Sequence, residues 1–163
     1  MKRASEIRRR GYWNAPTAVD NVVLDADERH RRRVVLTGEK GISFLLDLPQ
    51  PTVLKDGDGL VLEDGTMVRV TGKPEALIEV SAANVPELAR LAWQLGNRHV
   101  GVQIMDETLR LRRDHVLEAM LRGLGAHVTP IEAIFEPEPG AYHAPSQHSH
   151  DQDAGKQNTH KNV

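Results

Sequence analysis

Histidine is the residue type in this 163-residue chain that offers the most chemistry, because the chain has eight histidines and no cysteine. Neutral imidazole is a common protein ligand for nickel, copper and zinc. The spacing His148-Ser149-His150 can present two imidazoles to one ion. A solvated polar tail is the alternative, but irregular histidine-rich segments are typical of metal binding. The histidines of this C-terminal segment are His143, His148, His150 and His160.

His99 lies outside that segment, at the end of Gly96-Asn97-Arg98-His99, between an expected helix and an expected strand. A turn histidine on its own is more often a capping or surface residue. Two copies brought together by a twofold axis would form a partial metal site, and homodimers are the commonest oligomers. A partly filled site suits a carrier, because the ion must leave again. Trp93 either supplies interface area or packs in the core.

His115 follows the expected cap of a second helix, so it is either a further ligand or a polar residue at a helix start. His30 and His127 show no partner spacing and are interpreted as structural or surface residues. The sequence contains no cysteine nucleophile, no Gly-x-Ser-x-Gly elbow, no phosphate-binding loop and no His-Glu-x-x-His motif. It therefore favours a metal carrier over an enzyme.

The composition is that of a soluble globular protein, with 39% hydrophobic and 27% charged residues. Apolar runs such as Ile42–Leu46 are far shorter than the ~20 residues that cross a bilayer. The basic start, Met1-Lys2-Arg3, is not followed by an apolar core, so no secretory signal is expected. We therefore expect a cytoplasmic protein without a membrane partner.

Arginine is concentrated in two clusters, Arg8–Arg10 and Arg31–Arg33, although the net charge of the chain is −2. Such clusters can contact nucleic acid. With two Phe, two Tyr and two Trp in the whole chain, no stacking pattern accompanies them. A solvated basic face, or a patch that docks an acidic protein partner, is the favoured interpretation, and no nucleic-acid partner is expected.

Residues 1–73 are predicted to form an all-β domain, because short β-branched and apolar runs alternate with glycine-containing turns. Asp64-Gly65 between two apolar runs predicts a hairpin, since both residues can adopt positive φ. Gly72-Lys73-Pro74 stops the last strand and marks a domain boundary. The predicted strands are Arg33–Thr37, Gly41–Leu48, Leu60–Glu63 and Thr66–Val70.

Residues 74–138 are predicted to form a β-α-β-β-α-β unit, the element order of a ferredoxin-like domain, so the chain as a whole is of the α+β class. Asn84 and Asp114 cap two helices; Gly96 stops the first, and Gly123 and Gly125 end the second. The predicted strands are Leu77–Ser81, Val100–Ile104, Leu109–Arg112 and His127–Phe135. The predicted apolar helix stripes are Leu88, Leu91, Ala92 and Leu95, and then Val116, Leu117, Met120, Leu121 and Leu124.

From Glu136 onward the chain loses its apolar content, and Pro, Gly, Ser, Gln, Asn and His dominate. A segment of this composition cannot bury enough apolar surface to fold by itself, so it is predicted to be disordered. We assign residues 139–163 to a flexible, histidine-containing tail that follows the second domain.

Four stretches of the chain carry a family resemblance. Leu91–Val100 contains Gly-Asn-Arg-His, Arg113–Leu117 opens the second helix, and Phe135–His143 contains Pro-Gly-Ala-Tyr. Leu54–Val70 begins with Leu-Lys-Asp-Gly-Asp-Gly-Leu. Together these stretches closely resemble the UreE family, the urease accessory metallochaperones. The resemblance covers nearly the whole chain, and its motifs are specific in combination.

The resemblance implies a homodimer with a peptide-binding-like N-terminal domain and a ferredoxin-like metal-binding domain. It implies a carrier, not an enzyme, that delivers Ni²⁺ to apo-urease in concert with the other urease accessory proteins. Zn²⁺ and Cu²⁺ are expected competitors for this cargo site. A protein-binding adaptor in urease assembly, with incidental metal binding, is the alternative.

The same resemblance makes His99 the interfacial metal ligand from each subunit. Some family members carry a His-x-His pair at the start of the second helix. This chain has Arg113 at the earlier position, so only His115 remains of that secondary site. The resemblance adds tail histidines as supplementary ligands: His143, His148 and His150.

Overall fold

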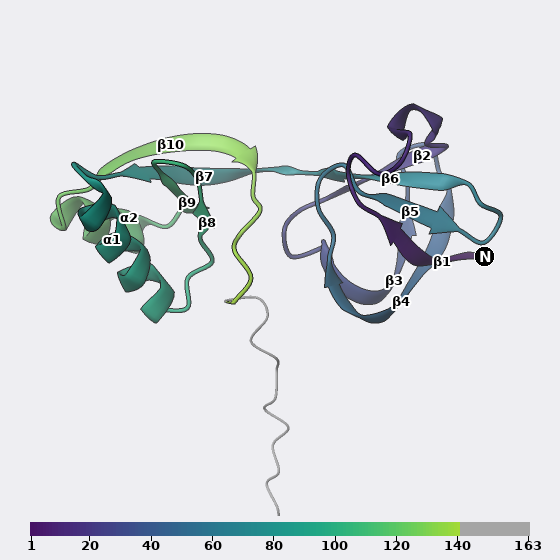
Figure 1. The fold of residues 1–163 in the computed structure, drawn as a ribbon, viewed down its shortest axis with the longest axis horizontal. Coiled ribbons are helices and arrows are strands. Elements are labelled where there is room, and N and C mark those ends of the chain that lie inside the picture. Colours follow the sequence, from purple (N-terminus) through teal and green to yellow (C-terminus); the bar gives the residue numbers. More distant parts are fainter. Residues whose placement is uncertain (141–163) are drawn as a thin grey trace, which may run out of the picture.

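The computed structural model describes residues 1–140, which fold around two separate β-sheets (Figure 1). A six-stranded sheet comes first, and a four-stranded sheet with two α-helices follows it. Each sheet has its own hydrophobic core. The predicted succession of an all-β unit and an α+β unit is thus confirmed. No helix within residues 1–140 is long and apolar enough to cross a membrane.

Six strands and one short 3-10 helix (Ala15–Thr17) make up the first unit. The strands are β1 (Lys2–Arg8), β2 (Asp20–Leu24), β3 (His30–Thr37), β4 (Ser43–Val53), β5 (Gly59–Leu62) and β6 (Met67–Gly72). Their order in the sheet is β2-β6-β5-β1-β4-β3. β1 runs parallel to β4 and β2 runs parallel to β6, whereas the other neighbours are antiparallel. The sheet is therefore mixed, and β2 and β3 are its edge strands.

Alternation along β4 builds the core of this unit. Phe44, Leu46 and Leu48 are buried, whereas Leu45 and Asp47 between them are half-buried. A strand with one face on a core requires this period of two. Each buried side chain of this size contributes about 1.5–3 kcal/mol. The other buried residues of this core are Ala4, Val22, Leu24, Leu54, Leu60, Leu62, Val68 and Val70.

The predicted hairpin at Asp64-Gly65 joins β5 to β6. The amide of Gly65 donates to the carbonyl of Leu62 at 2.9 Å. The hairpin is therefore confirmed, and of its two turn residues Gly65 takes a positive φ, 82°, whereas Asp64 does not.

The second unit has the predicted element order β-α-β-β-α-β. Its elements are β7 (Pro74–Ser81), α1 (Val85–Asn97), β8 (Gln103–Ile104), β9 (Leu109–Arg112), α2 (His115–Gly123) and β10 (His127–Ile134). The strand order is β10-β7-β9-β8, with all neighbours antiparallel. Both helices lie on the same face of this sheet (Figure 1). The core between them and the sheet is formed by Ile78, Val80, Leu91, Leu95, Leu109, Leu111, Leu121 and Val128.

Both predicted helix caps form. Asn84 Oδ1 accepts a hydrogen bond from the amide of Glu87 at 2.9 Å, and Asp114 Oδ1 accepts one from the amide of Leu117 at 2.9 Å. Each cap satisfies an amide that has no partner inside the helix, and such a cap contributes about 1 kcal/mol. The caps fix where α1 and α2 begin.

Two predicted apolar patterns are wrong in detail. β8 has two residues instead of the predicted Val100–Ile104, and Ile104 is 58% exposed. The reason is that β8 is an edge strand, and the valines before it pack on the helix side of the core. The stripe of α2 is narrower than predicted, since Val116 and Leu124 are exposed while Leu121 is fully buried. Val116 lies in the first turn of α2, and Leu124 is the C-cap beyond its last residue.

A buried carboxylate, that of Asp20, holds the turn between β3 and β4. It accepts hydrogen bonds from the amides of Asn21, Lys40 and Ile42 at 2.7, 2.9 and 3.0 Å. It lies so close to Gly38 that a Cβ there would be 2.1 Å from Asp20 Oδ2. Burial raises the pKa of the Asp20 carboxyl, but the three amides outweigh burial and hold this pKa below its ordinary value of 3.8.

We predict that Asp20→Ala lowers the free energy of unfolding by about 2–3 kcal/mol at neutral pH, because three amides lose a charged acceptor. The folded-state pKa of Asp20 lies below the unfolded-state value. Its stabilisation is therefore present above pH 3.8 and is lost as the pH falls through the folded-state pKa. Urea unfolding of both proteins at neutral and strongly acidic pH measures this. A stability difference that does not shrink in acid would contradict it.

Candidate metal centre

The end of α1 has a backbone conformation that is unusual for a histidine. The helix continues through Gly96, so the prediction that Gly96 stops it was wrong. Arg98 is the C-cap, the amide of His99 donates to Gly96 O at 3.0 Å, and the amide of Val100 donates to Leu95 O at 3.1 Å. These two bonds form a Schellman motif, in which the residue after the C-cap is left-handed. His99 is that residue, with φ of 58°.

Histidine at this position costs stability. Glycine is the usual residue there, because a Cβ crowds the backbone at positive φ by roughly 1 kcal/mol. Among residues 1–140, His99 is the one non-glycine residue with positive φ. Strained residues of this kind cluster at functional sites, where the side chain is needed for something other than folding. The His99 side chain is exposed, so its conformation supports the role of a ligand over that of a structural cap.

A groove of about 300 Å³ surrounds His99. Its walls come from the last turns of α1, from the segment that leads into β8 and from residues 138–140. Ile104 in this groove is 58% exposed, and Trp93 on α1 is 67% exposed. Core packing of Trp93 is thereby excluded, and apolar surface lies open on α1 and in the groove. The lining residues are Ala92, Gly96, His99, Val100, Val102, Ile104, Glu138, Pro139 and Gly140.

The segment of residues 136–140, which we call the strap, leads from the end of β10 to the His99 groove. The amide of Glu136 donates to Gln103 Oε1 at 3.0 Å, and the amide of Glu138 donates to Val102 O at 2.7 Å. The last three residues of the strap then line the groove. The prediction that disorder begins at Glu136 was therefore wrong, because these amides are held by the segment before β8 and by β8 itself.

A buried arginine ties the start of the strap to the first unit. Arg29 is 1% exposed, and its guanidinium donates to the backbone carbonyls of Leu24, Leu54 and Phe135. Its Nη1 also lies 3.7 Å from Glu136 Oε1. Leu24 and Leu54 belong to the first unit, whereas Phe135 and Glu136 follow β10. One side chain thus joins the two units at the point where the strap begins.

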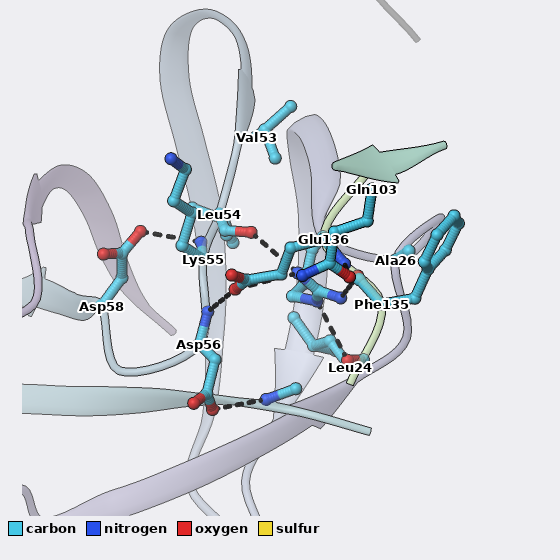
Figure 2. Close-up of polar contacts among 12 residues, drawn as sticks. Leu24, Ala26, Val53, Leu54, Lys55, Asp56, Asp58, Gln103, Phe135 and Glu136 are labelled. Carbon is cyan, nitrogen blue, oxygen red and sulfur yellow. Dashed lines mark hydrogen bonds and ion pairs between the residues drawn. The ribbon is translucent and has the colours of Figure 1, made fainter. Parts of the chain in front are cut away.

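The loop after β4 completes this joint, as Figure 2 shows. The amide of Asp56 donates to Glu136 Oε1 at 3.0 Å, and Asp56 Oδ1 accepts from the amide of Gly72 at 2.9 Å. Gly72 ends β6 directly against β10, since an added Cβ there would lie 2.3 Å from Ile134 Cγ2. The ends of β6 and β10 and the start of the strap therefore form one connected assembly.

His115 is exposed at the first residue of α2 and does not line the groove around His99. His30 begins β3 and is half-buried, and His127 begins β10 and is exposed. Within residues 1–140 no group of three or more His, Cys, Asp or Glu side chains comes together to hold an ion. The remaining predicted ligands lie outside the described residues: His143, His148 and His150, with His160.

Two side chains that hold the strap, Arg29 and Gln103, are not predicted by any pattern in the sequence. Arg29 bonds to a carbonyl 106 positions further along the chain, and Gln103 to an amide 33 positions further along. Sequence patterns that extend over a few residues do not reveal contacts between positions so far apart. One feature of the sequence could have pointed to Arg29: it is separated from the exposed cluster Arg31–Arg33 and comes before the start of β3.

Two family models match the chain, one after the other. The N-terminal domain of UreE urease accessory protein matches residues 2–72, and the C-terminal domain of UreE urease accessory protein matches residues 75–162. The two matches meet where β6 ends and β7 begins.

Several curated relatives are similar over most of their length. Urease accessory protein UreE of Bradyrhizobium sp. (strain ORS 278) is 53% identical over 150 residues, which is 92% of this chain and 70% of that protein. Urease accessory protein UreE of Chelativorans sp. (strain BNC1) is 48% identical over 143 residues, 88% of this chain and 90% of that protein. Both halves of the chain thus match the two domains of one class of protein, the urease accessory proteins. The chain belongs to the UreE family, whose members are accessory chaperones and not enzymes.

We predict that His99→Gly raises the free energy of unfolding by about 0.5–1 kcal/mol, because glycine relieves the strain at positive φ but loses more entropy on folding. His99→Ala keeps a Cβ at this position and should show no such gain. Urea unfolding of the wild type, His99→Gly and His99→Ala measures the order of their free energies of unfolding. A clear loss of stability in His99→Gly would show that the imidazole serves the fold, which would remove the argument for a ligand.

Proposed function

We propose that this protein is a nickel metallochaperone that binds Ni²⁺ between the ferredoxin-like C-terminal domains of a homodimer and delivers it to apo-urease during urease maturation in the cytoplasm. The observation that carries the proposal is the left-handed His99, an exposed imidazole kept where glycine would fold better. Membership of the UreE family of urease accessory proteins supports the part that concerns urease.

A homodimer would complete the site around His99. One imidazole per chain is too few for a nickel ion, but a twofold axis through the groove would place two equivalent imidazoles at one ion. Trp93 and Ile104 expose apolar area, by 67% and 58%, on α1 and in the groove. Exposed aromatic and aliphatic side chains of this kind suit the centre of a self-complementary interface.

The strap would bring further imidazoles to the same ion. Gly140 lines the groove, and His143 follows three residues later. Three residues of extended chain span at most about 10 Å. His143 is therefore within reach of an ion held by His99, as are His148 and His150 further along. Imidazoles that add to a partial shell and leave it again would allow the transfer of a cargo ion.

The metal chemistry sets two further expectations. Neutral nitrogen ligands suit Ni²⁺, but the affinity order of divalent ions favours Cu²⁺, and Zn²⁺ competes as well. Selectivity for nickel must therefore come from the geometry of the site or from the receiving urease complex. Protons compete for imidazole nitrogen, so ion binding weakens in acid. We assign His115 to a secondary surface site.

We predict that His99→Asn removes the tightest nickel site of the dimer. Asparagine tolerates positive φ, so the end of α1 is kept while the imidazole is lost. Loss of an outer-shell partner already weakens metal binding by about 10- to 100-fold, so loss of a direct ligand should cost at least as much. Isothermal titration of nickel chloride into both proteins, with sedimentation analysis of the dimer, measures affinity and ions per dimer.

His127→Asn is the matched control, because His127 is also exposed but begins β10 and does not line the groove. It should titrate like the wild type. Unchanged nickel affinity and stoichiometry in His99→Asn would refute the ligand assignment. A wild type that remains monomeric with nickel bound would refute the interfacial site.

We predict that deletion of residues 141–163 lowers the number of nickel ions per dimer and leaves the dimer and its urea unfolding midpoint unchanged. The strap would still end at the groove, but the tail imidazoles would be gone. The full-length protein with His143, His148, His150 and His160 all changed to Asn should show the same loss. Full nickel stoichiometry in either protein would contradict a role for the tail histidines.

A protein-binding adaptor in urease assembly is the second candidate, favoured by the exposed arginines of β3. In this case urease activation depends on protein contacts and not on the ion. Activation of apo-urease with limiting nickel distinguishes the two functions. The variant for this test combines His99→Asn with loss of the tail histidines. If it activates apo-urease as well as the wild type does, the adaptor is favoured. If activation is lost, the metallochaperone is favoured.

A further inference from the structure

Three consecutive arginines, Arg31, Arg32 and Arg33, lie exposed on β3. None of the three forms an ion pair with a carboxylate within the described part of the chain, whereas Arg110 and Arg122 are paired, with Glu79 and Glu118. Like charges side by side raise the local potential, and a bound anion relieves it. Three positive charges thus follow one another along β3, and none of them forms an ion pair with a carboxylate of residues 1–140.

β3 is also an edge strand. It pairs with β4 on one side, and no strand of residues 1–140 lies on its other side. An edge strand presents a row of unpaired N–H and C=O groups that can pair with a strand from another chain. β3 has eight residues, and its register with β4 shifts between Arg31 and Arg33, so its continuous stretch runs from Arg33 to Thr37. This stretch has the length of a typical strand of about five or six residues. Its free edge can thus hold an extended segment along two or more hydrogen-bonded pairs.

The side chains of β3 combine charge with apolar area. Arg33 lies opposite Asp47 on β4, and Val35 lies opposite Leu45. Asp47 is 3.6 Å from Arg3, so its charge is already shared with another arginine. Val35 is 53% exposed. An incoming strand would therefore meet guanidinium groups at one end of β3 and apolar surface further along.

We propose that the free edge of β3 binds an extended acidic segment of a protein partner by adding it to the sheet as a further strand. Main-chain hydrogen bonds supply the affinity in this mode of recognition, and side chains supply the specificity. Arg31, Arg32 and Arg33 select glutamate or aspartate, because the planar guanidinium fork matches a carboxylate with two parallel hydrogen bonds. The inference does not depend on nickel, since His99 lies in the other unit.

Single-stranded nucleic acid is the competing occupant of a basic surface. It would need aromatic side chains on which its bases can stack. The exposed aromatic residues within residues 1–140 are Tyr12 and Trp93, and neither lies on β3 or β4. Nucleic acid also makes no use of an unpaired strand edge. The combination of a free edge and arginines without aromatic neighbours therefore favours a peptide.

The test uses the full-length protein and a fluorescein-labelled, end-blocked peptide of eight residues that alternates Glu with Val and Thr. Fluorescence anisotropy should show binding at low salt and weaker binding at high salt. The variant R31Q/R32Q/R33Q should bind about tenfold more weakly or worse, because three exposed charge pairs are lost. Slower amide hydrogen exchange in β3 on peptide addition should show that the edge is the contact.

R69Q/K73Q/R90Q is the matched control, because it removes the same charge from exposed positions outside β3. It should bind the peptide like the wild type. A second peptide with Pro in place of each Val and Thr keeps the charge but lacks amide donors, and it should bind at least about tenfold more weakly. Thermal melting checks that both variants stay folded.

Three results would overturn the proposal. The first is absence of binding by the Glu-containing peptide, which would leave the arginines only as protection of the edge against aggregation. The second is equal binding by R31Q/R32Q/R33Q or by the Pro-containing peptide. The third is tighter binding of a labelled oligothymidylate than of the peptide, which would assign the surface to nucleic acid.

Discussion

Arg29 is a positive charge with almost no access to water, and the arrangement of both units follows from how that charge is satisfied. A buried guanidinium is tolerated only when its donors and its charge are matched. The carbonyls of Leu24 and Leu54 come from the first unit, while the carbonyl of Phe135 and the carboxylate of Glu136 come from the end of the second. Separating the units would remove the Phe135 carbonyl and the Glu136 carboxylate from the guanidinium. This joint therefore holds the start of the strap, whose later residues line the His99 groove.

Elements with local patterns could be predicted from the sequence. The helix starts at Asn84 and Asp114 and the alternation in β9 depend on residues a few positions apart. β1 could not be predicted, because it fully buries one residue, Ala4, and shows no apolar alternation. Its place is set by parallel pairing with β4, some forty residues later. The role of Arg29 could not be predicted either, because Phe135 and Glu136 become its neighbours only after both units have formed.

The candidate site was predictable in residue type but not in conformation. Imidazole is the strongest transition-metal ligand available in a chain without cysteine, but a turn histidine alone is more often a capping or surface residue. His99 could be selected as a ligand only through the resemblance of Gly-Asn-Arg-His to the UreE motif. The left-handed backbone of His99 could not be predicted, because glycine is the residue that usually ends a helix and Gly96 comes three positions earlier. The helix instead runs on until the amide of Val100 reaches Leu95 O, and Val100 packs against the core of the second unit.

The strain at His99 is small beside the total stability of a domain. Roughly 1 kcal/mol at one residue compares with a typical free energy of unfolding of about 5–15 kcal/mol. A folded domain remains stable despite a strain of this size, so the residue can be kept where its side chain has a use other than folding. The strained turn also restricts the backbone at His99, the one imidazole of residues 1–140 that lines the groove. In the proposed homodimer, each subunit would therefore present this imidazole in a fixed position. Under the proposed function, a site formed by one such residue per chain would be incomplete, and an incomplete ligand shell would allow a cargo ion to be both bound and released.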